Sequence, residues 1–333
     1  MLRLLVFALA FICVAAPARA DLAIRDGQLV ERDGAPFVMR GINIPHAWAP
    51  EHTARSIDDI AATGANTVRI ALSAGVRWKR NEPSEVARLI AHCRRRHLIV
   101  ILEVHDATGF GADSRAAHLG AALAYWGDLR AVLRGQEDYV LINIANEPFA
   151  GSATPAMWIE AHRTAIATLR GWGLRHTLVI DGADYGQDRS GTMRDHAREL
   201  LDSDPLRNVL FSIHMYQVYG RAEMVEAYFN AFHAAHLPLI VGEFGPDHQG
   251  EPVDEDTIMR MSAQQSVGYL GWSWGGNGGN VANLDMVEHF DASRLSPWGE
   301  RIINGANGIR ATARPAHIFQ QRRGFLAHFV QPR

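Results

Sequence analysis

The chain has very little cysteine, because only Cys13 and Cys93 occur in 333 residues. Cys13 falls in an N-terminal segment with the features of a removable signal, so Cys93 would be the single cysteine of the mature protein. This excludes an intramolecular disulfide, and a chain of this length can bury enough surface to fold without one. Cys93 lies in a helix predicted over residues 85–96, and no neighbouring residue marks a base. We interpret it as a small core residue.

Long hydrophobic runs are absent beyond the N-terminus. Residues 4–16 form an apolar run that is too short to span a bilayer. Arg3 precedes this run, and Ala18-Arg19-Ala20 has the small-x-small pattern of a cleavage site. We therefore expect residues 1–20 to be a secretory signal, the mature chain to start at Asp21, and the protein to be secreted, either extracellular or periplasmic.

The chain also lacks an excess of positive charge. The formal net charge is −3. Without residues 1–20, 31 basic residues face 36 acidic ones. A nucleic-acid-binding protein or one that binds an anionic membrane would need a concentrated basic face. We expect neither partner, and the modest negative charge is compatible with a neutral substrate.

No linker, charge block or short repeat divides the chain, so we expect one catalytic domain over residues 21–319 and a C-terminal tail over 320–333. Residues 22–39 have the turns of a β-hairpin. Eight short apolar runs then alternate with amphipathic helical stretches, which predicts an α/β fold, a single (β/α)8 TIM barrel with an N-terminal β-hairpin. The expected strands are residues 37–43, 66–72, 98–104, 139–145, 177–181, 209–214, 238–243 and 268–274. The helical stretches include residues 56–63, 85–96, 117–133 and 155–170. No Gly-x-Gly-x-x-Gly follows the first strand, which disfavours a dinucleotide-binding fold.

Two apolar, β-branched stretches end abruptly in a glutamate. Residues 142–148 read INIANEP and contain Glu147, and residues 239–245 read LIVGEFG and contain Glu243. The carboxyl ends of barrel strands carry the catalytic loops. Glycosidases also cleave the glycosidic bond with two carboxyl groups, one acting as acid and the other as nucleophile or base. One such glutamate could be a solvated strand end, but further polar residues at neighbouring strand ends argue against this for both.

Polar and aromatic side chains end most of the other expected strands. Burying an unpaired charge in a barrel costs several kcal/mol, so we expect these groups to pair with one another. An arginine and a tyrosine would keep a nucleophilic carboxylate ionised. An asparagine beside the acid can bind the sugar 2-hydroxyl. A tryptophan supplies an apolar floor for a sugar ring. The residues are Arg69, His105, Asn146, His214, Tyr216 and Trp272.

These motifs make the chain resemble the family 5 glycoside hydrolases of the large retaining (β/α)8 clan, in particular the bacterial secreted endo-β-1,4-mannanases of subfamily 8. The resemblance extends from residue 39 to about residue 319. The motifs that carry it are MRGIN at 39–43, LEVHD at 102–106, YVLINIANEP at 139–148, FSIHMY at 211–216 and GWSWGGNG at 271–278. The residues after 319 depart from the pattern, and they contain no recognisable binding module.

The resemblance implies a role for each matching residue. Glu147 matches the general acid/base and Glu243 the nucleophile. Arg69 matches the arginine that keeps the nucleophile ionised, and Tyr216 the tyrosine that donates to it. The remaining matches contact sugar: Asn146, His105 and His214 around the sugar at the cleavage point, Trp272 stacked on that sugar, and His46 and Trp48 further along the cleft.

We therefore expect a secreted, monomeric endo-β-1,4-mannanase that hydrolyses mannan, galactomannan and glucomannan by a retaining double displacement, without a cofactor or metal. Its partner is a β-mannan polysaccharide or manno-oligosaccharide. The two carboxyl groups should lie about 5–5.5 Å apart, because inverting enzymes need a wider gap.

Three alternatives stay open. The same chemistry could act on another β-glycan, as in an endo-β-1,4-glucanase, and the carboxylates do not distinguish the two. A metal-dependent hydrolase on the same barrel is suggested by 16 histidines, although no His-Glu-x-x-His occurs. A catalytically dead sugar-binding barrel would be expected to lack one of the carboxylates, and both are present.

Overall fold

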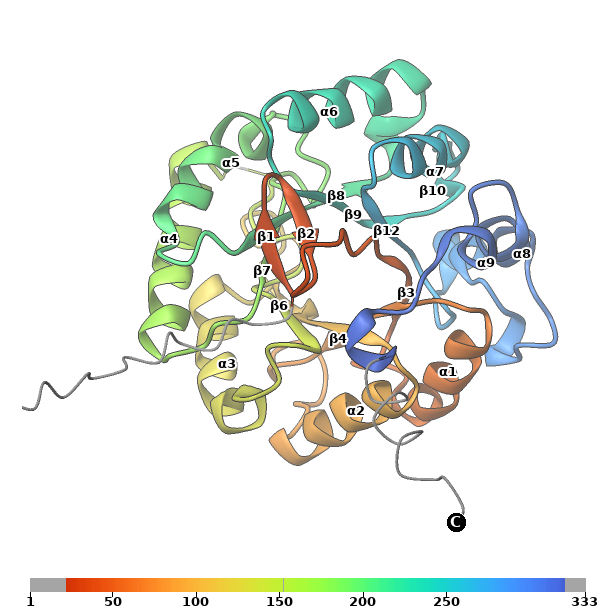
Figure 1. Ribbon diagram of the computed structural model, residues 1–333, viewed down its shortest axis with the longest axis horizontal. Helices are drawn as coiled ribbons and strands as arrows, with labels where there is room; N and C mark the ends of the chain where they lie inside the picture. Colours follow the sequence, from red (N-terminus) through yellow and green to blue (C-terminus); the bar gives the residue numbers. More distant parts are fainter. Residues whose placement is uncertain (1–21, 152, 321–333) are drawn as a thin grey trace, which may run out of the picture.

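The computed structural model describes residues 22–151 and 153–320. The predicted signal at 1–20 and the predicted tail from residue 321 lie outside the described residues. Eight parallel strands form a closed barrel in the order β12-β3-β4-β5-β6-β7-β8-β9. The predicted (β/α)8 barrel is confirmed (Figure 1). The strands are β3 (Arg40–Ile44), β4 (Thr67–Leu72), β5 (Ile99–Val104), β6 (Val140–Asn143), β7 (Leu178–Asp181), β8 (Val209–Met215), β9 (Leu239–Phe244) and β12 (Gly268–Gly271).

A ring of helices surrounds the barrel (Figure 1). Their apolar faces cover the outer side of the strands, as the alternating pattern predicts. Proline at the first turn marks the start of several helices, and the Thr154 side chain caps α4 by accepting from the Met157 N–H. The first helix begins at Pro50, earlier than expected, because this proline starts a helical turn before the amphipathic pattern is evident. The helices are α1 (Pro50–Ala62), α2 (Pro83–Arg95), α3 (Leu119–Leu133), α4 (Pro155–Gly171), α5 (Thr192–Ser203), α6 (Ala222–Ala234), α7 (Glu255–Gln264), α8 (Pro297–Asn304) and α9 (Ile309–Thr312).

The predicted hairpin is formed by β1 (Ala23–Arg25) and β2 (Gln28–Val30), which pair antiparallel. It lies across the amino-terminal end of the barrel (Figure 1). Gly27 at its turn has a φ of +76°, and a side chain there would lie 2.8 Å from the backbone of His236. The hairpin therefore packs so closely that only glycine fits at this turn.

The opposite, carboxyl end of the barrel carries short irregular elements that build its rim. They are η1 (His105–Ala107), η2 (Gln217–Tyr219), β10 (Asp247–His248), β11 (Glu251–Pro252), η3 (Gly279–Leu284) and η4 (Glu288–Phe290). The pairing of β8 with β9 shifts register between Ile213 and His214, which brings His214 opposite Glu243. Such an irregularity re-aims a side chain at a barrel rim. Within the part of the chain that the structure describes, every helix is too short or too polar to cross a membrane.

Candidate active site

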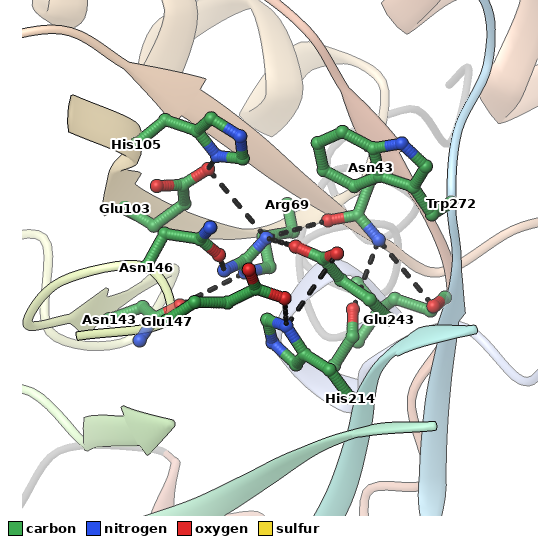
Figure 2. Close-up of polar contacts among 12 residues, drawn as sticks. Asn43, Arg69, Glu103, His105, Asn143, Asn146, Glu147, His214, Glu243 and Trp272 are labelled. Carbon is green, nitrogen blue, oxygen red and sulfur yellow. Dashed lines mark hydrogen bonds and ion pairs between the residues drawn. The ribbon is translucent and has the colours of Figure 1, made fainter. Parts of the chain in front are cut away.

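Glu147 and Glu243 face each other across a groove at the carboxyl end of the barrel. The groove has a volume of about 420 Å³, and both glutamates line it together with His105, Tyr216 and Trp272. One carboxylate oxygen of Glu147 lies within 4.8 Å of one of Glu243. Figure 2 shows the two carboxylates converging from different strand ends. The structure thus brings together the two acids that the sequence predicted to form a pair.

Two donors hold Glu243. Arg69 Nη1 donates to its Oε1 at 2.8 Å, and the Tyr216 hydroxyl donates to its Oε2 at 3.0 Å. Both donors and the carboxylate itself are buried. Charge-assisted hydrogen bonds of this kind favour the ionised form of a carboxylate. Glu243 therefore has the environment of a nucleophile.

Arg69 is the centre of a buried polar network (Figure 2). Besides Glu243, its guanidinium donates to Asn43 at 3.0 Å, Asn143 at 3.0 Å and Asn146 at 2.6 Å. Burial would lower the pKa of Arg69, but the carboxylates around it, above all Glu103, outweigh burial and raise it. A buried arginine is tolerated only with such complete pairing. The network also orients the Asn146 amide beside the acid.

Glu147 has a different environment. Burial, reinforced by the nearby charge of Glu243, raises the pKa of Glu147 above the usual carboxyl value, although a hydrogen bond with His214 opposes this. Its backbone N–H donates to Asp181 Oδ2 at 3.1 Å. Its φ is +41°, in the left-handed region that non-glycine residues seldom adopt. Strained backbone of this kind clusters at active sites, and here it aims a protonatable carboxyl into the groove.

His214 lies beneath the two glutamates and is fully buried. Its Nδ1 is 2.8 Å from Glu147 Oε1 and 3.6 Å from Glu243 Oε2. Burial alone would lower the pKa of His214, but Glu243, Asp181 and Glu147 raise it to about 10. At neutral pH the ring is therefore a cation that supports the two carboxylates from below. The sequence predicted a sugar contact for His214, yet it is not among the residues that line the groove.

An aromatic cluster forms a wall at one side of the groove, and its members His105 and Trp272 line the groove itself. The rings of His105 and Trp272 stack with centroids 5.3 Å apart, and Trp48 packs against both. Trp78, after β4, joins this cluster. Glu103 accepts from His105 Nδ1 at 2.8 Å; it outweighs the effect of burial and raises the pKa of His105.

The segment at residues 275–278 holds two of these rings in place. Trp272 Nε1 donates to Asn277 Oδ1 at 2.9 Å, and Trp48 Nε1 donates to the Gly276 carbonyl at 3.0 Å. Asp285 fixes the segment in turn, because its carboxylate accepts from the Gly276 N–H, the Asn277 N–H and the Asn277 side chain. Two stacking surfaces thus depend on one carboxylate.

His46 does not join the groove, although the sequence predicted a sugar contact for it. It is 3% exposed, and both ring nitrogens are engaged, Nδ1 with Thr53 at 2.8 Å and Nε2 with Glu85 at 3.0 Å. His46 therefore ties the loop after β3 to α1 and α2. Trp48, which follows it in the same loop, packs on the aromatic wall instead.

Several residues around the groove were not predicted to belong to the site. Asp181 lies 3.4 Å from Arg69 Nη2 and 3.4 Å from His214 Nε2. A signal was present, because residues 178–181 read LVID, an apolar strand that ends in a carboxylate like those before Glu147 and Glu243. The others are Asn43, Glu103 and Asn143 beneath the groove and Tyr185, Gln187, Gln217, His248 and Gln249 along it.

Within the described residues, two groups place three potential metal ligands close together: Glu31 with Asp33 and His317, and Glu147 with His214 and Glu243. The second group is poorly suited to a cation. A metal ligand must offer the lone pair of a neutral imidazole. With a pKa of about 10, His214 keeps its protons at neutral pH. The chemistry of these donors fits acid–base catalysis better than metal binding.

A closed parallel barrel that presents one ion-paired and one pKa-raised carboxyl across a groove defines a glycoside hydrolase. Comparison with known proteins agrees. The model of the family described as Cellulase (glycosyl hydrolase family 5) matches residues 30–278. The chain therefore belongs to glycosyl hydrolase family 5, which confirms the predicted resemblance.

Individual relatives are similar over almost the whole chain. The mannan endo-1,4-beta-mannosidase of Cellvibrio japonicus is 48% identical over 94% of this chain and 72% of its own length. A protein of the same name from Streptomyces lividans is 50% identical over 91% of this chain and 78% of its own. The beta-mannanase of Thermomonospora fusca, also solved in complex with mannotriose and mannohexaose, is 51% identical. It superimposes with a TM-score of 0.88, covering 91% of this chain and 100% of that one.

Proposed function

We propose that the protein is an endo-β-1,4-mannanase that hydrolyses internal bonds of mannan, galactomannan or glucomannan with retention of anomeric configuration. The observation that carries this proposal is the approach of Glu147 to Glu243 within 4.8 Å. Retaining glycosidases hold their carboxyl groups about 5–5.5 Å apart, whereas inverting ones leave room for a water between them. The choice of mannan is supported by the names of the relatives and by the manno-oligosaccharides bound in the Thermomonospora fusca protein.

In the first step, Glu243 acts as the nucleophile. A carboxylate oxygen forms a bond to the anomeric carbon as the glycosidic C–O bond breaks, and Glu147 gives its proton to the departing oxygen. The two hydrogen bonds from Arg69 and Tyr216 orient Glu243 for this attack. The raised pKa of Glu147 keeps its proton available at the start of the reaction.

In the second step, Glu147 takes a proton from water, which attacks the anomeric carbon and releases Glu243. The Asn146 amide oxygen accepts from Arg69, and its nitrogen donates to Thr108 at 2.7 Å. These contacts place the amide beside the acid, where it can bind the 2-hydroxyl of the sugar. Trp272 offers the floor on which that sugar stacks.

The decisive experiment compares reducing sugar released from mannan with that from carboxymethylcellulose. We expect strong preference for mannan; preference for carboxymethylcellulose would make the protein an endo-β-1,4-glucanase instead. Early NMR spectra of mannohexaose digests should contain the β-anomer of the new reducing end first. An α-anomer at that stage would overturn retention.

We also propose that the enzyme is exported and acts as a monomer. Residues 1–20 carry the charged start, apolar run and small-residue site of a secretory signal. Every residue of the groove comes from one chain, so a second copy is not needed to complete it. N-terminal sequencing of the exported protein should begin at Asp21, and size-exclusion chromatography should give the mass of one chain. An uncleaved N-terminus would refute the proposed export signal, and a dimer would refute the proposed monomer.

A further inference from the structure

Tyr185 is a large aromatic residue that is left exposed beside the groove. It lies in the loop between β7 and α5, lines the groove, and keeps 41% of its surface exposed. The strands β7 and β8 stand opposite β3 and β4 in the closed ring. Tyr185 therefore faces the groove from the rim opposite the wall that contains Trp48 and Trp78.

The backbone that presents Tyr185 is strained. Asp184, Tyr185 and Gly186 have φ values of 55°, 57° and 71°, so two non-glycine residues in succession are left-handed. Such a conformation persists only where its surroundings hold it, and it is concentrated at functional sites. The Asp184 N–H donates to the Phe149 carbonyl at 3.0 Å, and the His214 N–H donates to the Gly186 carbonyl at 2.8 Å. The turn is thus tied to the loop after Glu147 and to the strand that carries His214.

The ring of Tyr185 lies on the Glu147 side of the site. A methyl group placed on Gly109 would come within 2.8 Å of Tyr185 Cε1, so the ring covers this glycine. The Gly109 N–H donates to the Glu147 carbonyl at 3.1 Å. Trp272, by contrast, follows the strand next to Glu243, and its backbone N–H donates to the Phe244 carbonyl. The two aromatic residues therefore flank the pair of carboxylates on opposite sides.

The chemistry assigns different sugars to these two sides. The nucleophile bonds to the sugar that stays on the enzyme, whereas the acid protonates the oxygen of the part that leaves. Resting on the proposed function, we propose that Tyr185 is a binding subsite for the departing segment of the polysaccharide, its ring packing against the C–H face of a pyranose. Gln187, two residues further along the chain, also lines the groove. The same subsite would hold a sugar acceptor in transglycosylation.

The test compares two substrates that differ in the leaving group. Mannohexaose leaves a saccharide that can reach Tyr185, whereas β-mannobiosyl fluoride leaves only a fluoride ion. We expect Tyr185→Ala to lower kcat/KM for mannohexaose by about fivefold, the worth of one aromatic contact, and to leave the fluoride unchanged. Alanine and tyrosine both have a Cβ atom, so both are strained in the left-handed conformation of residue 185. The substitution therefore removes the ring without changing the backbone strain.

Tyr185→Trp should retain activity on mannohexaose, and Met224→Ala, a change at an exposed apolar residue on α6, should affect neither substrate. Equal loss on both substrates, loss on the fluoride alone, or no loss at all would overturn the subsite. These outcomes differ from failure of the proposed function, because in that case the unmodified enzyme would not cleave mannohexaose.

Discussion

Asp181 Oδ2 lies 3.4 Å from His214 Nε2, and its side chain is fully buried beneath the groove. The same carboxylate accepts from the Glu147 N–H and contacts Arg69. Its pKa is held far below the usual range, because His214 and Arg69 outweigh the effect of burial. Asp181 thus contacts both buried cations of the site and shares their compensation with Glu103, Glu147 and Glu243.

Asp181→Asn should therefore destabilise the protein and slow catalysis, although asparagine has the same shape. Leaving Arg69 and His214 undercompensated should cost about 3 kcal/mol of unfolding free energy. The disturbed site should lower kcat on mannohexaose by at least about tenfold. Urea unfolding and steady-state kinetics measure the two effects. Asp195→Asn, at an exposed ion pair with Arg194, is the control and should change neither. Unchanged stability and kcat in Asp181→Asn would contradict the charge balance.

Glu147→Ala should remove general acid catalysis. We expect mannan hydrolysis to fall about 10³-fold. A dinitrophenyl β-mannobioside should still react in the first step, because its leaving group departs without a proton. Burst kinetics would then reveal accumulation of the glycosyl enzyme on Glu243. If both substrates lost activity to the same extent, Glu147 would not be the acid.

The basic limb of the pH profile should report Glu147. The acid acts when protonated, so kcat/KM should fall as pH rises through a pKa that lies above the ordinary value of about 4.3. The hydrogen bond and charge of His214 favour the ionised form of Glu147. His214→Gln should therefore raise this pKa further and move the basic limb to higher pH. A shift to lower pH would show that the limb belongs to another group.

Asp285→Ala should weaken substrate binding more than chemistry. Without its carboxylate, residues 275–278 lose the contacts that hold them beneath Trp48 and Trp272. We expect KM for mannohexaose to rise at least about tenfold, the scale of a lost charge-assisted hydrogen bond, with a smaller change in kcat. Asp291→Ala, at an exposed carboxylate that accepts from Ser293, provides the control. An unchanged KM in Asp285→Ala would mean that the positions of Trp48 and Trp272 do not depend on the Asp285 carboxylate.

His162 should make the protein sensitive to acid. It is buried on α4, and burial lowers its pKa to about 4. Between this value and the ordinary value of about 6.5 the unfolded chain binds a proton that the folded protein does not, so stability falls as pH falls. His162→Asn should flatten this slope by up to about 1.4 kcal/mol per pH unit. Urea unfolding across this pH range tests it, with the exposed His196→Asn as a control; an unaltered slope would exclude His162 as the source.

The barrel and its carboxylates could be predicted because local patterns determine them. The periodicity of strands and helices can be recognised from consecutive residues. A charged residue inside an apolar strand, such as Arg69, indicates that a partner of opposite charge must lie nearby. Asp181 had the same signal at the end of its strand. The importance of Asp181 depends on Arg69 and His214, which contact it from other strands. The sequence alone does not show that these three side chains meet.

Other features depend on distant contacts or on backbone conformation. His46 and Trp48 lie in one loop, so the sequence predicts the same role for both. Glu85 on α2, however, binds His46 and holds it away from the groove. Tyr185 gives no periodic signal, because its position comes from a left-handed turn held by Phe149 and His214. Only the folded arrangement distinguishes these cases.

The scarcity of cysteine has a practical consequence. Within the described chain, Cys93 is the sole thiol; it is fully buried, and burial raises its pKa to about 12. Such a thiol should resist alkylating reagents at neutral pH. A cysteine introduced at the exposed Met224 would then accept a fluorophore selectively, without first replacing Cys93, which would give a singly labelled enzyme whose groove is unaltered.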